Sequence, residues 1–217
     1  MSNVRPKLKL LPFHQYRGVK PSDPLKFYYW PFIGRLYRKR VELCLAECPG
    51  GQRVLEVGFG SGATFLNLSD IYKEIYGLDL DASIHSVDDL FKNLGVCVRL
   101  TNGNVLSMPY SDDFFDTILL ISILEHLKPA QQIEAFRELR RVLKPQGSVV
   151  YGVPVERPLM VWAFKLMGYN IRDHHFSTEK DVYEAAKNVF TERRMVSMPC
   201  IFSALGDMYE IGHFVKT

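Results

Sequence analysis

Residues 54–62 end an apolar run in three alternating glycines, Gly58, Gly60 and Gly62. Glycine adopts positive φ and has no Cβ, so a ligand can closely approach the backbone N–H groups of such a turn. Asp79 closes the next apolar run, and Asn104 follows the strand expected after that. In a doubly wound sheet these positions meet at the carboxyl edge of the strands, where ligands bind. The spacing predicts a site for an adenosine-containing ligand.

The glycine loop fits two ligand classes. Residues 58–63 also satisfy the G-x-G-x-x-G/A dinucleotide fingerprint, with Asp79 at the distance expected for a ribose-binding acid. Glu56 shares a strand face with residue 58, so its carboxylate lies beside the loop, where it opposes a pyrophosphate and suits an ammonium group. The amide of Asn104 suits an adenine edge. These features favour a sulfonium cofactor, and an NAD(P)-binding oxidoreductase is the alternative.

The elements that position these residues follow from the hydrophobic periodicity. Strands are expected at 53–57, 74–79, 96–100, 116–122 and 148–153, and helices at 31–46, 62–72, 82–93, 129–143 and 178–188. Alternation of this kind is typical of βαβ units. Two more strands, at 190–198 and 209–215, would pair antiparallel at one edge. The expected fold class is α/β, a doubly wound, mostly parallel seven-stranded (Rossmann-like) sheet with an antiparallel C-terminal edge.

Length and composition are those of one domain. The chain has 217 residues, 47% of them hydrophobic, which one core can accommodate. The expected parts are a basic and aromatic extension with a helix (1–50), a cofactor-binding core (50–155), a variable segment with a lid (155–188) and C-terminal strands (189–217). No apolar run reaches the roughly 20 residues of a membrane span, and no secretory signal is visible. Four cysteines without disulfide or metal spacing fit the cytoplasm.

Four motifs between about residues 50 and 155 resemble the class I S-adenosylmethionine-dependent methyltransferases, specifically the small type-11 group. In order, they are EVGFGSG, YGLDLD, GNVLSMPYSDDFFDTILLISILEHL and LRRVLKPQGSVV. The group often has aspartate where Asn104 stands and glycine where Gln146 stands, and an amide can still bond an adenine edge. The resemblance implies S-adenosyl-L-methionine as cofactor and S-adenosyl-L-homocysteine as product.

The same resemblance assigns the cofactor-binding residues. The glycine loop would hold the methionine portion, the turn after the second strand the ribose, and the loop after the third strand the adenine, while the end of the fourth strand would border the methyl group. In that order these residues are Glu56, Gly58, Phe59, Gly60 and Gly62, then Asp79 and Leu80, then Asn104 and Val105, then Ile121 and Ser122.

Little catalytic apparatus is needed, because a sulfonium methyl is already activated and the enzyme mainly aligns a nucleophile and excludes water. A general base would assist a hydroxyl or amine acceptor, and the candidates are His126, Glu125 and His175. As an alternative, Glu125 and His126 only cap or orient the following helix. No metal site is expected.

The net charge of +3 conceals an asymmetry. Residues 1–40 hold ten lysines and arginines against one acid, Asp23, so this segment is +9, and it contains eight aromatic residues. Such a mixture suits an anionic membrane surface, nucleic acid or an anionic substrate, whereas the alternative is an extension whose aromatic residues pack on the domain. The segment before residue 27, rich in proline, is expected to be an extended arm that meets an anionic surface or substrate, and residues 27–40 are expected to form part of the pocket wall. Candidate acceptor contacts are Tyr28, Tyr29, Trp30, His174 and His175.

The fourth strand bears on the acceptor class. It ends in Ile121-Ser122-Ile123-Leu124, whereas enzymes that methylate a base amine resemble one another in an Asn or Asp followed by Pro-Pro-aromatic there. A small or lipid- or glycan-linked acceptor is therefore expected before nucleic acid. A cofactor-binding module without catalysis is the non-enzymatic alternative.

Overall fold

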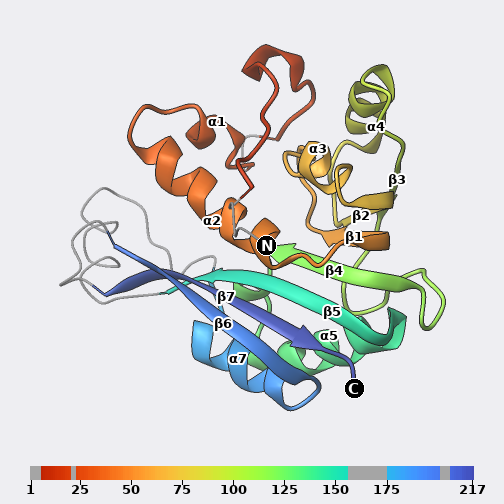
Figure 1. The fold of residues 1–217 in the computed structure, drawn as a ribbon, viewed down its shortest axis with the longest axis vertical. Coiled ribbons are helices and arrows are strands. Elements are labelled where there is room, and N and C mark those ends of the chain that lie inside the picture. Colours follow the sequence, from red (N-terminus) through yellow and green to blue (C-terminus); the bar gives the residue numbers. More distant parts are fainter. Residues whose placement is uncertain (1–5, 21–22, 156–174, 201–205) are drawn as a thin grey trace.

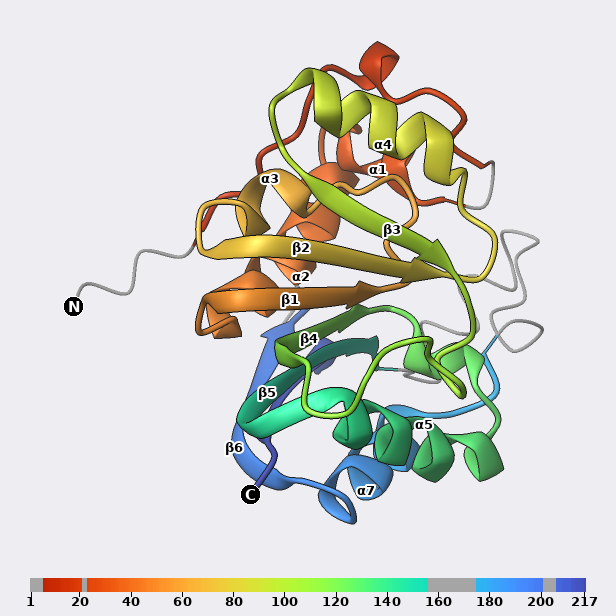
Figure 2. The same cartoon turned by 90° about the vertical axis from the view of Figure 1, so that its right-hand side faces the viewer.

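A seven-stranded sheet forms the centre of the molecule in the computed structural model, which describes residues 6–20, 23–155, 175–200 and 206–217 (Figures 1 and 2). The strand order is β3-β2-β1-β4-β5-β7-β6; the first five strands in this order are parallel, and β7 pairs antiparallel with β5 and β6. The expected fold class is confirmed. The strands are β1 (Gly51–Val57), β2 (Tyr72–Asp79), β3 (Val98–Asn102), β4 (Phe115–Ile121), β5 (Leu143–Pro154), β6 (Thr191–Pro199) and β7 (Asp207–Val215).

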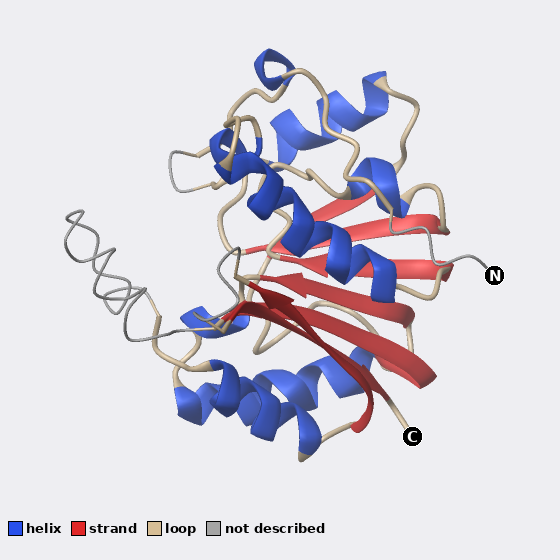
Figure 3. Cartoon of the chain, turned by 60° about the vertical axis from the view of Figure 1, so that its left-hand side comes forward, coloured by secondary structure: helices blue, strands red, loops and turns tan. Residues whose placement is uncertain are grey.

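Helices cover both faces of the sheet (Figure 3). On one face α2 packs on β4, β5 and β7, and on the other α5 and α7 pack together and on β5 and β7. The α-helices are α1 (Leu25–Tyr28), α2 (Ile33–Glu47), α3 (Phe65–Leu68), α4 (Ile84–Asn93), α5 (Pro129–Val142) and α7 (Glu179–Lys187), with 3-10 turns η1 (Phe13–Gln15) and η2 (Leu124–His126). The lid expected within 155–188 falls mostly on residues 156–174, outside the described residues.

Two hydrophobic clusters form the core, one on each side of the sheet. Strand β4 supplies both: Leu119 belongs to the cluster under α2, whereas Ile118 and Leu120 belong to the cluster under α5, because successive side chains of a strand point to opposite faces. All three are fully buried. A strand buried on both faces is typical of a parallel sheet, which is why the sequence shows a continuous apolar run here.

Two element predictions need correction. The helix expected at 62–72 is only the four-residue α3, because turns continue from the glycine loop to Thr64 and β2 begins at Tyr72, paired with Gly51 of β1. Residues 144–147, left between the helix expected at 129–143 and the strand expected at 148–153, lie inside β5, which already pairs at Leu143, and a register shift opposite β4 absorbs the irregular residues. Gln146, where the resembling group often has glycine, has φ of +64°.

The N-terminal arm packs on the domain, which corrects the expectation of an unpacked arm. Leu8 and Tyr16 are buried, and the backbone N–H of Leu8 donates to Glu42 Oε1 at 3.0 Å. The backbone N–H of Lys9 donates to Asn67 Oδ1 at 2.9 Å. Side-chain acceptors on α2 and α3 thus satisfy backbone donors that the proline-rich arm cannot pair within itself. Among the helices of the described residues, none has the length and apolar character to cross a membrane.

Candidate functional site

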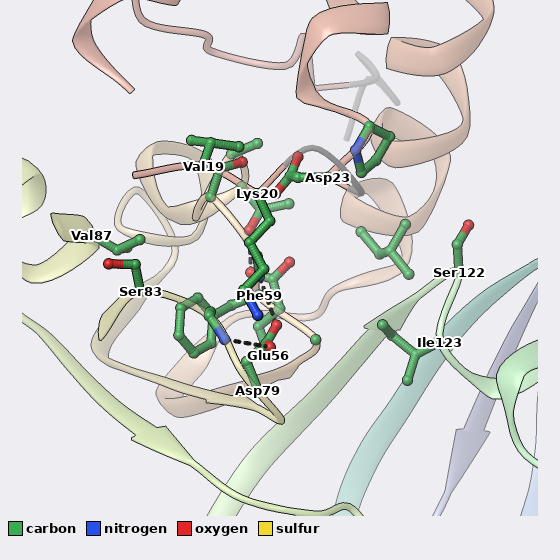
Figure 4. A pocket seen from close by; sticks show the side chains of 18 of the residues that line it. Val19, Lys20, Asp23, Glu56, Phe59, Asp79, Ser83, Val87, Ser122 and Ile123 are labelled. Carbon is green, nitrogen blue, oxygen red and sulfur yellow. Dashed lines mark hydrogen bonds between the residues drawn. The ribbon is translucent and has the colours of Figure 1, made fainter. Parts of the chain in front are cut away.

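A pocket of about 350 Å³ lies at the carboxyl ends of β1, β2 and β4, with the N-terminal arm, the end of α1 and the middle of α2 as its other walls (Figure 4). It is therefore at the edge of the sheet where the sequence predicts the ligand. The lining residues include Arg17, Lys20, Asp23, Tyr28, Arg40, Glu56, Gly58, Phe59, Gly60, Asp79, Ile121, Ser122, Ile123 and His126.

The glycine loop follows β1 and is approached closely by the chain itself. Gly58 and Gly60 have φ of +74° and +49°. A Cβ on Gly58 would collide with the side chain of Ile123, and one on Gly60 would lie 2.5 Å from Asp23 Oδ2. Glycine is therefore required for the backbone conformation and also for the close approach of β4 and the arm.

Glu56 is a carboxyl group buried at the pocket wall, only 4% exposed. Burial raises its pKa to about 8; a hydrogen bond from the Thr64 hydroxyl opposes the rise, and the nearby Asp79 and Asp23 add to it. A group in this state ionises readily only if a cation enters the pocket. The position suits an ammonium group, as the sequence predicts.

Asp79 joins the two loops that form the pocket edge. Its Oδ2 accepts a hydrogen bond from the backbone N–H of Gly60 at 3.0 Å, and its Oδ1 accepts from the N–H groups of Asp81 and Ala82, each at 3.0 Å. This carboxylate fixes the glycine loop relative to the turn after β2 and still borders the pocket. A ligand hydroxyl placed here would share an acceptor that is already held in position.

Asp23 brings the arm to the glycine loop, a contact that the sequence analysis missed. Its carboxylate accepts hydrogen bonds from Ser61 and from the backbone N–H of Leu25, the latter at 2.8 Å. Burial raises the pKa of Asp23, although these hydrogen bonds act to lower it. Lys20 forms an ion pair with Asp81. The only sequence signal was that Asp23 is the single acid among forty residues.

Arg40 and Ser122 line the part of the pocket next to the end of β4, where the sequence analysis expects Ser122 to border the methyl group. Arg40 Nη1 donates to Ser122 Oγ at 3.1 Å, and Ser122 Oγ lies 2.9 Å from the hydroxyl of Tyr209 on β7. Ser122 has φ of +57°, unusual for a residue other than glycine. The sequence analysis included Arg40 in the pocket wall expected from residues 27–40 but gave this side chain no role of its own.

The three candidate general bases come together. One carboxylate oxygen of Glu125 and one ring nitrogen each of His126 and His175 all lie within 4.8 Å of one another. The centroids of the two imidazole rings are 5.3 Å apart. The carbonyl of Glu125 accepts from the N–H of Phe176 at 2.8 Å, which holds the later segment on η2. His126 lines the pocket, so this group could move a proton there or hold a metal ion. His174 lies outside the described residues.

Four predicted cofactor residues lie outside the described pocket lining. A Cβ on Gly62 would meet the rings of Phe65 and Phe91 at 2.7 Å, so this glycine serves packing. Leu80 is 71% exposed, and Val105 is buried in the core under α5. Asn104 is exposed, and its Oδ1 accepts from the N–H of Leu106 at 3.0 Å. Their contact with a cofactor stays a prediction.

Of the three adjacent aromatic residues proposed for the acceptor, Tyr28 alone lines the described pocket. The Tyr29 hydroxyl donates to the carbonyl of Leu11, and its ring packs on Phe13. Trp30 is 48% exposed and packs edge-on against Phe27. Successive side chains at the end of α1 point in different directions, so these three adjacent residues do not all face the pocket.

Residues 55–151 match the methyltransferase domain family known as Methyltransf_11. An uncharacterized methyltransferase, YcgJ of Bacillus subtilis, is 36% identical over 104 residues, which are 47% of this chain and 40% of YcgJ. The ubiquinone/menaquinone biosynthesis C-methyltransferase UbiE of Vibrio vulnificus is 31% identical over 136 residues, 58% of this chain and 51% of UbiE. The match thus spans about half or less of the length of these curated relatives.

The fold also matches solved structures. The N-methyltransferase NodS of Bradyrhizobium japonicum, in complex with S-adenosyl-L-homocysteine, superposes with a TM-score of 0.68 and 18% identity, covering 94% of this chain and 96% of NodS. At this identity the likeness concerns the fold alone. It extends over the N-terminal and C-terminal parts that the sequence matches leave out.

Proposed function

We infer methyl transfer as the reaction because this chain belongs to the class I S-adenosylmethionine-dependent methyltransferases of the type-11 group. The acceptor we propose is a small or lipid- or glycan-linked molecule. One observation carries the cofactor assignment for this chain: a buried carboxyl group, Glu56, borders a glycine loop whose other rim is Asp79. The UbiE relative, a C-methyltransferase of ubiquinone/menaquinone biosynthesis by name, supports a small-molecule acceptor.

The donor set fits S-adenosylmethionine. We propose that Glu56 pairs with the ammonium group of the methionine portion and that Asp79 accepts hydrogen bonds from ribose hydroxyls. A pyrophosphate would instead meet Asp23, Glu56 and Asp79 together, an unfavourable set for two negative charges. When bound, the cofactor supplies an activated methyl group, and the pocket walls align the acceptor and exclude water.

The residues at the end of β4 would serve the acceptor. We propose that His126, at the pocket lining and grouped with Glu125 and His175, takes the proton of a hydroxyl or amine acceptor. A carbon acceptor that is already nucleophilic would need no such base.

Calorimetry with S-adenosylmethionine, S-adenosylhomocysteine and NAD tests the cofactor assignment. We expect the two sulfur compounds to bind and NAD to bind far more weakly. The variant Glu56→Gln should lose affinity for both sulfur compounds, whereas Glu134→Gln, which changes an exposed glutamate of α5, should keep it. Tight binding of NAD with none of the other two would overturn the proposal.

We also propose that the turn between α1 and α2 contacts an anionic membrane surface. Four consecutive apolar residues here, residues 30–33, are exposed; Trp30 is 48% exposed, Phe32 86% and Ile33 42%. Exposed apolar runs of this length are normally avoided unless they serve a function. Lys26 and Arg35 flank the turn and are exposed, and residues 24–41 contain no acid. Aromatic side chains beside cations suit the headgroup region of an anionic bilayer.

Vesicle binding tests this contact. The protein should sediment with vesicles of phosphatidylcholine mixed with phosphatidylglycerol, less with phosphatidylcholine alone, and less at high salt. Phe32→Ser should weaken binding, whereas Ile71→Ser, which changes an apolar residue 41% exposed at the other end of the strands, should not. With Trp162→Phe, Trp30 is the sole tryptophan, and its emission should shift to the blue on binding. Equal binding by Phe32→Ser and the unchanged protein would refute the contact.

A further inference from the structure

We propose that Arg40, with Ser122, Tyr28 and Tyr209, forms a subsite for an anionic group, a carboxylate or phosphate, carried by the methyl acceptor. The inference rests on the proposed function, because it names the class of acceptor for the same pocket. It concerns the part of the pocket next to the end of β4, away from the turn after β2 that carries Asp79.

The guanidinium of Arg40 is held by neutral groups. Nη1 donates to Ser122 Oγ at 3.1 Å, and the Tyr28 hydroxyl is a further hydrogen-bond partner. The guanidinium carbon Cζ lies 4.4 Å from the ring centroid of Tyr37 and 5.8 Å from the ring centroid of Tyr209. Burial raises the pKa of both Tyr28 and Tyr209, so their hydroxyls stay protonated at neutral pH. None of these four contacts supplies a negative charge.

The charge of Arg40 is therefore uncompensated within the described part of the chain. Arginine stays protonated in proteins, and no carboxylate of the described residues forms an ion pair with it. Its Nε is buried and has no hydrogen-bond partner among them. A buried cation is costly unless it is paired, and a planar guanidinium with a donor to spare matches a carboxylate or phosphate. Because Arg40 lines the pocket, a ligand can provide that partner.

The position of the subsite favours the acceptor over the cofactor as the source of the anion. Ser122 directly follows Ile121 at the end of β4 and is held at φ +57°, a strained conformation of the kind found at functional sites. Figure 4 shows Ser122 and Ile123 across the pocket from Ser83 and Val87 of the turn and helix that follow β2. An anion bound to Arg40 would orient the acceptor from the side opposite the ribose-binding acid.

Calorimetry on protein saturated with S-adenosylhomocysteine tests the subsite, with octyl phosphate, octanol and inorganic phosphate as probes. We expect octyl phosphate to bind at least tenfold more tightly than octanol, its uncharged counterpart. Inorganic phosphate, if it binds as well as octyl phosphate, identifies a site for a free anion; if it binds more weakly, the site takes the headgroup of an amphiphile. Equal affinity for octyl phosphate and octanol would overturn the inference.

Variants of Arg40 test whether the preference for octyl phosphate over octanol depends on this side chain. Arg40→Met should abolish the preference for octyl phosphate, Arg40→Lys should retain part of it, and Lys39→Gln, which removes the neighbouring charge of α2, should retain all of it. If Arg40→Met does not fold, as judged by its thermal melt, Ser122→Ala serves in its place and should weaken the preference. An unchanged preference in folded variants would contradict the role of Arg40.

A cofactor control separates this inference from the proposed function. If the unchanged protein fails to bind S-adenosylhomocysteine, the proposed function fails first. If Arg40→Met weakens binding of S-adenosylmethionine more than tenfold but leaves that of decarboxylated S-adenosylmethionine unchanged, Arg40 holds the cofactor carboxylate, and the acceptor subsite is refuted. We expect both cofactors to lose affinity by less than threefold.

Discussion

Cofactor binding should release a proton from Glu56, and varying the pH reveals it. Burial raises the pKa of this carboxyl group to about 8 in the ligand-free protein, so it is mostly protonated at neutral pH. The ammonium group proposed for this position pairs only with the ionised form, so the ligand must displace the proton. Affinity for S-adenosylhomocysteine should therefore fall as the pH falls below about 8.

The size of the effect follows from the pKa. At pH 7, with a pKa of about 8, roughly one site in ten is ionised, so binding should release about 0.9 proton. Between pH 7 and pH 9 the affinity should rise about tenfold, or about 1.4 kcal/mol, because the ionised fraction changes by that factor. An unperturbed glutamate, with its pKa near 4.3, would already be ionised across this range and would produce no such change.

Titration calorimetry at pH 7 in two buffers with different heats of ionisation measures the released proton directly. The variant Glu56→Gln is the control, because it keeps the size and removes the titration, while any titration of the ligand amine stays in both proteins. The reasoning is refuted if the unchanged protein and the variant release the same number of protons. It is also refuted if the pH dependence of affinity is identical in the two.

Other substitutions test the remaining geometry. The pKa of Glu56 is higher in the folded than in the unfolded chain, so its stabilising effect is complete below the unfolded-state pKa and is lost as the pH rises through the folded-state pKa. The unfolding free energy of ligand-free Glu56→Gln should therefore exceed that of the unchanged protein at pH 8, by up to about 4 kcal/mol, and should equal it near pH 4. Asp79→Ala should weaken S-adenosylhomocysteine binding by about 1.5–3 kcal/mol per lost hydrogen bond in calorimetry, and an unchanged affinity would exclude the ribose role. Gly62→Ala should cost about 1–3 kcal/mol more in denaturant unfolding than Gly95→Ala, because both have positive φ but only the first meets aromatic rings; equal losses would contradict the steric argument.

The sheet and the glycine-loop side of the site were predictable because their signals are local. Strands β1, β2 and β4 each contain an apolar run, and Glu56 and Asp79 lie at the ends of two of these runs. The topology of a doubly wound sheet then brings those ends to one edge. Asn104 was predicted in the same way from the end of β3, but β3 lies one strand further from β1 than β2 does. Its side-chain oxygen accepts a hydrogen bond from Leu106 in the same loop.

The contacts between residues on the opposite side of the pocket were not predictable, because these residues meet only through tertiary packing. Arg40 comes from α2, Ser122 from the end of β4 and Tyr209 from β7, and no motif spans these elements. Likewise His126 and His175 were separate candidates in the sequence. Their meeting depends on backbone hydrogen bonds from residues 176 and 177 to the carbonyl of Glu125, which is 51 and 52 residues earlier.

Part of the positive charge of the basic N-terminal segment is used within the protein. Lys9 pairs with Asp70, Lys20 pairs with Asp81, and Arg40 faces the pocket, so these charges are used within the protein. Of the other exposed cations of the described segment, Lys26 and Arg35 flank the apolar turn between α1 and α2, whereas Lys7 and Arg17 lie on the arm. The arm itself crosses the glycine loop, where Asp23 bonds to Ser61 and lines the pocket. The arm therefore forms one wall of the proposed cofactor site, and the contact that we propose with an anionic surface lies at that turn.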